Sequence, residues 1–387
     1  MFEETKMTEK LYYKDAYIKT FRACVISADE RNGKFDVVLD RSAFFPNQGG
    51  QSADSGYIGT SRVLDVYEDA GTLHHVCDTP VSVGAELDCS LDFDQRFEKM
   101  QSHTAEHLLC GIMHKLYGCE NVGFHLGEDE VVFDVNTVLT SEQMDEVLVT
   151  ANRAVYENRK VSARFPSSSE LQAMAYRSKS DISGEVRIVE IEGYDSCACC
   201  APHVSYTGEI GVISILNFEK HRGGTRIYML AGVRAERDYT KRRAVAQRIS
   251  ALTSEPQATI DVAVEKLIND AENLRQSLKQ AKETEARLRA ELMPKADKNA
   301  VVLLADFKIP ELISFSNEAS SKVGGVLVAL CGKDGDFKYV ISSKETDVRA
   351  LAKDINAALL GRGGGRPEMI QGSFASTLKD IKRYFEV

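Results

Sequence analysis

The hydrophobic pattern of this 387-residue chain changes near Phe97, and that change constrains the fold more than any other feature. Before it, residues 16–93 hold short apolar stretches separated by Asn-Gly, glycine and proline turn signals, a pattern typical of β-strands. From Phe97 the apolar residues recur at helical spacing until Gly118, where the pattern stops. The sequence therefore predicts a small β barrel or sandwich, followed by a helix, within an α+β protein.

The second half of the chain predicts long helices and then a separate domain. From residue 238 to Leu292 the pattern is helical with a break at Pro256, and apolar residues recur at two heptad positions from Val264 onward. Such a seam favours a coiled-coil arm, which either folds against the preceding helix or pairs with another chain. After Pro294, strand and helix signals alternate. The expected parts are a barrel-like domain (1–95), a central α+β domain (96–237), a helical coiled-coil arm (238–293) and a small C-terminal α/β domain (294–387).

The composition predicts a soluble protein with reduced thiols. Nine cysteines are spread without framework spacing, and the first twenty residues lack the apolar core of an export signal. No segment offers about 18 consecutive apolar residues, so we expect no membrane partner and a cytoplasmic location. The formal charge of −10 argues against a protein coated in nucleic acid, although residues 222–248 are locally basic. That stretch is either a surface for a polyanion or a solvated helix face.

Two short motifs predict a metal site. His103 and His107 lie four residues apart on the expected helix, so both imidazoles project from one face. Cys199 and His203, with three residues between them, complete a set of one cysteine and three histidines, which is an ordinary ligand mixture for tetrahedral zinc. We therefore predict one Zn²⁺ per chain. The cysteine-rich stretch also contains a C-x-x-C motif, which leaves half a zinc ribbon or a thiol redox pair as alternatives.

Four separated strings, in order and spacing, point to one family. They are SAFFPNQGGQSADSG (42–56), HTAEHLL (103–109), CAPHVSYTGEIG (200–211, after Cys199) and GTRIYMLAG (224–232). Together they resemble the editing domain of alanyl-tRNA synthetase and its free-standing relatives, the AlaX proteins. The C-terminal GRGGGRPEMIQGS resembles the glycine-rich end of the DHH-associated domain of that synthetase. The resemblance therefore covers nearly the whole chain.

The resemblance implies roles for residues around the metal site. The family pattern Cys-Gly-Gly-Thr-His is here Cys199-Cys200-Ala201-Pro202-His203, so the ligand positions are kept while the linker stiffens and loses a hydroxyl. Ser42 stands at the hydroxyl position that the resemblance implicates in recognising misattached serine. Gln51 is either a polar residue of the pocket or a structural turn anchor. Ser42 and Gln51 are therefore the candidate catalytic residues.

The resemblance also implies tRNA contacts and a partner subunit. Arg226 matches a family arginine and lies in the basic stretch with Arg222, where both are candidates for phosphate contact. Arg362 and Arg366 flank the glycines of GRGGGRP, where backbone amides and arginines are suited to cradle phosphate. For this C-terminal domain the resemblance implies either tRNA binding or self-association, and we expect a homodimer through it.

The implied activity is that of a trans-editing hydrolase. It would deacylate alanine tRNA mischarged with serine, with glycine as a second candidate, at a zinc-containing site. A pocket sized for alanine rejects close competitors poorly by binding alone, so a second hydrolytic sieve is useful. Four protein ligands fill all the positions of a tetrahedral zinc, whereas a catalytic zinc keeps one coordination position open for water or substrate. We expect a zinc with an open position here. The alternative is a non-catalytic tRNA-binding or regulatory protein with a structural zinc.

Overall fold

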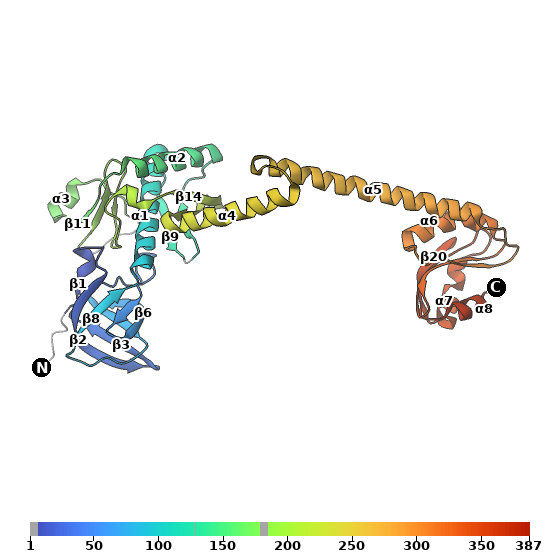
Figure 1. Cartoon of the computed structure of the whole chain (residues 1–387), viewed down its shortest axis with the longest axis horizontal. Coiled ribbons are helices and arrows are strands. Elements are labelled where there is room, and N and C mark those ends of the chain that lie inside the picture. The colour runs from blue at the N-terminus through green and yellow to red at the C-terminus, as the bar shows by residue number, and fades with distance from the viewer. Residues whose placement is uncertain (1–6, 128, 179–184) are drawn as a thin grey trace. The chain divides into compact units, whose positions relative to one another are not determined.

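A computed structural model of the chain describes residues 7–127, 129–178 and 185–387. The α+β class is confirmed, since helices and several separate sheets share the chain (Figure 1). Contacts group the chain into two compact units that meet between Val245 and Ala246, and the finer division into four parts stays a prediction. Within the described ranges, no helix is both long enough and apolar enough to cross a membrane.

Six strands of the first unit close into a barrel in the order β2-β3-β7-β6-β5-β8, where the sequence left a barrel or a sandwich open. Closure gives every strand two neighbours and leaves no free sheet edge. Asn32 and Gly33 join β2 to β3 with φ values of 55° and 74°, the left-handed conformation that a tight hairpin requires. The strands are β2 (Thr20–Arg31), β3 (Lys34–Leu39), β5 (Gly56–Ile58), β6 (Ser61–Asp69), β7 (Thr72–Cys77) and β8 (Glu86–Leu91).

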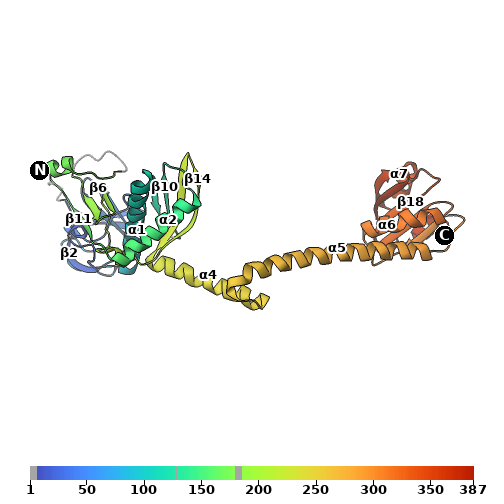
Figure 2. The same ribbon diagram turned by 90° about the horizontal axis from the view of Figure 1, so that it is seen from above.

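The helix α1 (Phe93–Tyr117) follows the barrel and is buried without interruption from Met100 to Met113. A surface helix would bury one stripe only, so α1 is a central core helix. Gly118, at φ 66°, ends it in the left-handed conformation typical of a glycine C-cap, as the sequence predicts. Figure 2 shows α1 beside α2 (Ser141–Glu157) and the strands of a four-stranded sheet.

Two further sheets complete the first unit. The four-stranded sheet, in the order β14-β15-β10-β9, shares a hydrophobic core with α1 and α2. A three-stranded sheet, β11-β12-β13, contacts α1 through β13. Their bounds are β9 (Asn121–Leu126), β10 (Val131–Val135), β11 (Val161–Arg164), β12 (Ile188–Ile191), β13 (Asp195–Ala198), β14 (Ile213–His221) and β15 (Gly224–Ala231).

A buried ion pair ties α1 to the barrel segment. The guanidinium of Arg96 contacts the carboxylate of Asp54, and only 1% and 2% of the two side chains is exposed. Arg96 also donates to the carbonyls of Ala43 at 2.6 Å and Ala16 at 3.1 Å, while Asp54 accepts from the amide of Phe45 at 2.6 Å. Because these groups are out of water, each depends on the others for its charge and hydrogen bonds.

The second unit contains α5 (Ile260–Leu292), which follows α4 (Gly232–Thr253), and a sheet in the order β16-β17-β18-β20-β19. The glycine-rich GRGGGRPEMIQGS forms the hairpin β19 (Gly361–Arg366) and β20 (Met369–Phe374). The other elements are β16 (Ala300–Leu303), β17 (Leu327–Lys333), β18 (Asp336–Ser342), α6 (Ile309–Ala319), α7 (Val348–Ala358) and α8 (Leu378–Tyr384).

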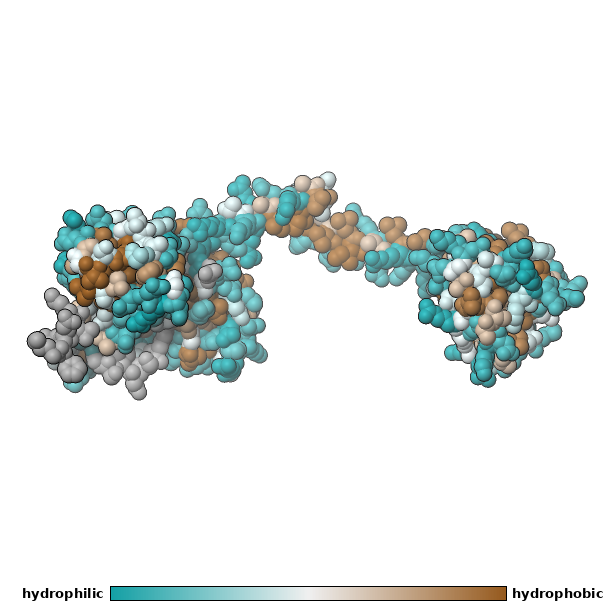
Figure 3. All heavy atoms as spheres, turned by 90° about the horizontal axis from the view of Figure 1, so that it is seen from below, coloured by the Kyte–Doolittle hydropathy of each residue, from teal (hydrophilic) through white to brown (hydrophobic). Residues whose placement is uncertain are grey.

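The predicted heptad seam of α5 is exposed, and another face of the helix packs on the second unit. Ala286 and Ala290, which lie outside the two heptad positions, are buried in a cluster with residues of α6. Leu267, Leu274 and Leu278 are 57%, 70% and 59% exposed. Figure 3 shows apolar residues in brown along this helical segment. Pairing of this exposed seam in a coiled coil stays a prediction.

We predict that Arg96→Ala destabilises the first unit by about 3–5 kcal/mol, because it leaves the carboxylate of Asp54 buried without its cation. Chemical denaturation of the full chain, followed by a probe in the first unit, measures this change. Arg22→Ala is the matched control, since Arg22 is 65% exposed and lies 3.6 Å from Glu86 in a surface pair. We expect a change below about 1 kcal/mol for the control. Equal effects of the two substitutions would contradict the role of the buried pair.

Candidate metal centre

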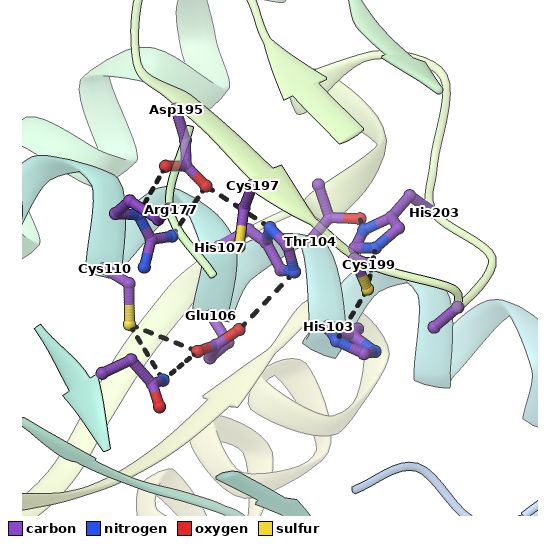
Figure 4. A network of polar contacts seen from close by, with 12 residues as sticks. His103, Thr104, Glu106, His107, Cys110, Arg177, Asp195, Cys197, Cys199 and His203 are labelled. Atoms are coloured by element: carbon purple, nitrogen blue, oxygen red, sulfur yellow. Dashed lines mark hydrogen bonds and ion pairs between the residues drawn. The ribbon is translucent and has the colours of Figure 1, made fainter. Parts of the chain in front are cut away.

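The four predicted ligands gather at one point (Figure 4). His103 and His107 come from α1, and Cys199 and His203 from the segment that follows β13. Their ligand atoms all lie within 4.8 Å of one another, and Cys199 Sγ is 3.6 Å from His103 Nε2 and 3.4 Å from His203 Nε2. A tetrahedral ion with bonds of about 2.0–2.3 Å requires separations of this size. The donors therefore fit a single zinc-like ion.

Nδ1 of each imidazole faces an oxygen atom, through a hydrogen bond in His103 and His203 and as an ion-pair contact in His107, which leaves Nε2 to face the centre. His103 Nδ1 lies 2.9 Å from Gln51 Oε1, His203 Nδ1 lies 3.0 Å from Thr104 Oγ1, and His107 Nδ1 lies 3.3 Å from Asp195 Oδ2. The hydroxyl of Thr104 donates to the carbonyl of Met100 at 2.7 Å, so its oxygen accepts the Nδ1 proton of His203. The neutral tautomer with a free Nε2 lone pair follows for His203.

The environment sets the protonation states of the ligands. Burial opposes the thiolate of Cys199, but His103 and His203 hold the pKa of this thiol well below its usual value. Burial lowers the pKa of His203 to about 3. Burial also acts to lower the pKa of His107, whereas Cys197 and Asp195 raise it well above its usual value. Thiolate and neutral imidazole are the forms that bind metal, so a metal bound by His107 would have to displace a proton from it.

A cavity of about 540 Å³ opens on the ligands His103, His107 and Cys199. Its wall includes Cys200, which stands at a glycine position of the family pattern. It also includes three side chains that the sequence did not single out: Tyr13, Phe165 and Arg187.

These three side chains are in contact with one another on the cavity wall. The guanidinium of Arg187 lies 5.3 Å from the ring centre of Tyr13 and donates to the carbonyls of Cys199 at 3.0 Å and Ala201 at 2.8 Å. The rings of Tyr13 and Phe165 meet edge to face at 5.2 Å, and Phe165 is 45% exposed. The metal centre therefore shares a cavity with aromatic faces and a cation.

Gln51 is a turn residue that holds a ligand. Gly49 and Gly50 have φ values of 64° and 79°, and the backbone groups of Gln48 and Gln51 pair across them at 3.1 Å. A Cβ on Gly50 would lie 2.6 Å from the carbonyl oxygen of Phe124, so only glycine lets the loop approach this close. Gln51 itself is fully buried and is not part of the described cavity wall. The turn-anchor interpretation therefore fits its position, while a catalytic role stays a prediction.

Ser42 lies against the barrel strand β7 rather than on the described cavity wall. Its side chain is fully buried, and its hydroxyl lies 2.8 Å from His75 Nε2. His75 Nδ1 donates to the carbonyl of Val37 at 2.9 Å, so Nε2 accepts from Ser42. This contact explains the hydroxyl at position 42 structurally, and a role in recognising serine stays a prediction.

The four arginines expected to contact tRNA lie in both units. Arg226 forms two hydrogen bonds with the carboxylate of Asp134, at 2.7 and 2.8 Å, and Arg222 occupies the turn between β14 and β15. Arg362 and Arg366 are exposed on β19, at the edge of the second unit's sheet. Of the four, Arg226 thus has a carboxylate partner that a phosphate would have to replace.

Sequence reasoning missed Thr104, Asp195 and Arg177, which orient the ligands. Each is a single residue of an ordinary type, and no spacing rule connects it to its partner. Their contacts arise only in the folded chain, where β13 and the segment after it lie against α1 and Arg177 pairs with β13.

Comparisons with known proteins agree with the resemblance. Residues 186–228 match the family model described as the threonyl and alanyl tRNA synthetase second additional domain. The chain is 29% identical over 378 residues to the alanine-tRNA ligase of Ignicoccus hospitalis, covering 93% of this chain and 40% of that protein. It is 25% identical over 406 residues to the alanyl-tRNA editing protein AlaX-L of Pyrococcus horikoshii, covering 97% and 96%. It is 29% identical over 282 residues to the alanyl-tRNA editing protein Aarsd1 of Bos taurus, covering 68% and 64%.

These matches confirm the resemblance that the motifs indicate. The chain is similar over nearly its whole length to an AlaX-type editing protein and to a part of alanine-tRNA ligases. It spans about two fifths of the length of the ligases that it matches.

We predict that His75 makes the barrel less stable in acid. Burial lowers the pKa of His75 to about 4, below the value of about 6.5 for an unfolded chain. Above pH 6.5 both states are neutral, but between pH 6.5 and 4 the unfolded state takes up a proton that the folded state refuses. About 3 kcal/mol of stability is lost over this window. Denaturation as a function of pH should show a shallower loss for His75→Asn, while His114→Asn, at an exposed site, retains the wild-type slope.

Proposed function

We propose that this protein is a trans-editing hydrolase that removes a wrongly attached amino acid, serine first and glycine second, from alanine tRNA. The observation that carries the proposal is the cavity that three of the four predicted ligands, His103, His107 and Cys199, share with an aromatic wall. Its similarity to proteins named as alanyl-tRNA editing proteins supports the substrate class. The protein would act in the cytoplasm, where charged tRNA is used.

The cavity wall suits the single-stranded 3′ end of a tRNA. Aromatic faces bind unpaired bases by stacking, and Phe165 offers an exposed ring while Tyr13 carries the guanidinium of Arg187. The cation of Arg187 suits a phosphate or the ester carbonyl near the ligands. In this arrangement the base is held at the aromatic wall and the aminoacyl ester points to the metal centre.

Zinc, held by His103, His107, Cys199 and His203, would supply a Lewis acid near the ester. Gln51 contributes a fixed dipole beside it, because Oε1 accepts from His103 while Nε2 is buried and has no hydrogen-bond partner among the described residues. Because Gln51 is buried behind the cavity wall, this amide would reach the carbonyl oxygen of the substrate only if binding opens the wall; a preorganised donor there stabilises developing negative charge. Ser42 would act indirectly, through the barrel wall, unless the substrate brings it to the cavity.

Phosphate contacts and self-association complete the proposal. Arg222 and Arg226 would meet the tRNA backbone near the first unit, and Arg362 and Arg366 would do so at the edge of the second unit. The C-terminal domain would also form a homodimer.

The alternative is a binding protein with a structural zinc. The four predicted protein ligands favour this alternative, because they would occupy all four positions of a tetrahedral zinc. The open-site version that we propose requires that zinc removal from a still-folded protein abolish deacylation. An unchanged rate after removal would favour the alternative.

We predict that the purified chain holds one zinc and hydrolyses Ser-tRNA(Ala) in preference to Ala-tRNA(Ala). His103→Ala and Cys199→Ala each remove a ligand and should lower the rate by more than about 100-fold, beyond the loss typical of residues behind the ligands. Elemental analysis and deacylation of Ser-, Gly- and Ala-charged tRNA measure both effects. Cys200→Ala is the control for metal content, because this neighbouring thiol is outside the ligand cluster.

No selective loss of the seryl ester with wild-type protein would overturn the hydrolase in favour of the binding protein. A loss of zinc in Cys200→Ala equal to that in Cys199→Ala would contradict the assignment of the ligands.

We predict that the full chain has twice its monomer mass of 42.8 kDa in solution. A chain that ends at Ala290 lacks the C-terminal domain and should be monomeric in light scattering coupled to size exclusion. If the shortened chain keeps the oligomeric state of the full chain, the exposed seam of α5 becomes the dimer contact instead.

A further inference from the structure

An ion pair lies directly behind one metal ligand (Figure 4). Arg177 Nε and Nη2 donate to the two carboxylate oxygens of Asp195, each at 2.8 Å. Asp195 Oδ2 also lies 3.3 Å from His107 Nδ1. The side chains of Arg177, Asp195 and His107 are only 9%, 2% and 1% exposed. A carboxylate this far from water needs a cation to keep its charge, and Arg177 provides it.

A second metal site is another interpretation of the same residues. His107, Asp195 and Cys197 also offer ligand atoms within 4.8 Å of one another. However, Arg177 already occupies both carboxylate oxygens, and its fixed positive charge would repel a divalent cation there. His107 would also have to give both ring nitrogens to metals. The contacts favour a carboxylate that orients His107.

His107 differs from the other two histidine ligands in its partner. His103 is held by a neutral amide and His203 by a neutral hydroxyl, whereas His107 faces a carboxylate. A carboxylate behind an imidazole fixes the Nδ1-protonated tautomer and makes Nε2 a stronger donor. The charged partner therefore sets His107 apart from the other two histidines.

The ion pair also links the two halves of the ligand set. Asp195 begins β13, the strand that leads directly to Cys199. Arg177 pairs with the same strand through its backbone, since its amide donates to Ser196 at 2.8 Å and its carbonyl accepts from Ala198 at 2.9 Å. Through Asp195, the strand that carries the cysteine is therefore tied to the helix that carries His107.

We propose that Asp195, held by Arg177, is a positioning residue that presents Nε2 of His107 to the metal and keeps the helix ligands in register with Cys199. This inference rests on the metal site of the proposed function. It does not require that the site hydrolyse tRNA, because its primary readout is metal affinity.

The test is the zinc affinity of the full chain, measured by competition with a chromophoric chelator. Asp195→Asn keeps the size of the side chain and removes its charge, and we expect affinity to fall by about 10- to 100-fold. Asp92→Asn is the matched control, because Asp92 forms a similar two-bond pair with Arg62, at 3.2 and 2.5 Å, away from the ligand set. The control should bind zinc within about twofold of wild type.

A second variant separates a loss of zinc affinity from unfolding. This control is needed because Asp195→Asn leaves Arg177 buried without a counter-charge. Asp195→Asn combined with Arg177→Met removes both charges and should show the same loss of zinc affinity in a folded protein. The visible spectrum of the Co²⁺-substituted protein should shift in both variants and stay unchanged in Asp92→Asn. Wild-type zinc affinity and an unaltered Co²⁺ spectrum in a folded variant would overturn the inference.

The wild-type protein provides a test that needs no variant. ¹⁵N spectra of the zinc-loaded chain should show His107 protonated at Nδ1 and free of a proton at Nε2. The opposite tautomer would overturn the inference while leaving the proposed hydrolase intact. A wild-type chain that binds no zinc would overturn both, whereas zinc binding with the expected losses but without deacylation would overturn the hydrolase alone.

Discussion

The first unit depends on one constraint, the burial of polar side chains along α1. A buried polar group is costly without a hydrogen-bond partner, and several of these side chains are met by groups from other segments. Gln101 donates to the carbonyl of Glu209 at 2.9 Å, Glu106 accepts from Asn121, and His107 faces Asp195. Segments far apart in the sequence are thereby required at fixed places around one helix.

The candidate metal centre is a local case of this constraint. Two of its ligands belong to α1, and the partners that orient its imidazoles come from a barrel loop, from α1 itself and from β13. The same helix is fastened at its start by Arg96, which contacts the barrel segment through Asp54. The contacts that stabilise the fold and the contacts that orient the ligands therefore involve the same helix, α1.

The sequence predicts the parts that follow a spacing rule. The four ligands follow i,i+4 spacing and a short cysteine-histidine motif, and α1 ends at Gly118 because glycine there adopts the left-handed conformation. Closure of the barrel depends on pairing between β2 and β8, whose paired residues run from Cys24 with Glu86 to Thr20 with Ser90, so no local pattern distinguishes a barrel from a sandwich.

The residues behind the ligands could not be predicted for a related reason. Asp195 and Arg177 have no motif, and their meaning comes only from a tertiary contact. Ser42 carries a family signal, but a single hydroxyl in a strand does not show which neighbour it bonds, and here that neighbour is His75. A sequence pattern identifies candidate metal ligands more readily than it identifies the residues that orient those ligands.

The tight turn at Gly49 and Gly50 has a consequence for protein design. The turn places Gln51 against His103. Gln51 belongs to a loop next to the barrel, whereas His103 belongs to α1. Transplanting the histidine helix and the cysteine-histidine segment into another scaffold would therefore supply donors without the loop that sets one of their ring orientations. The candidate centre therefore depends on the barrel loop as well as on α1 and the cysteine-histidine segment.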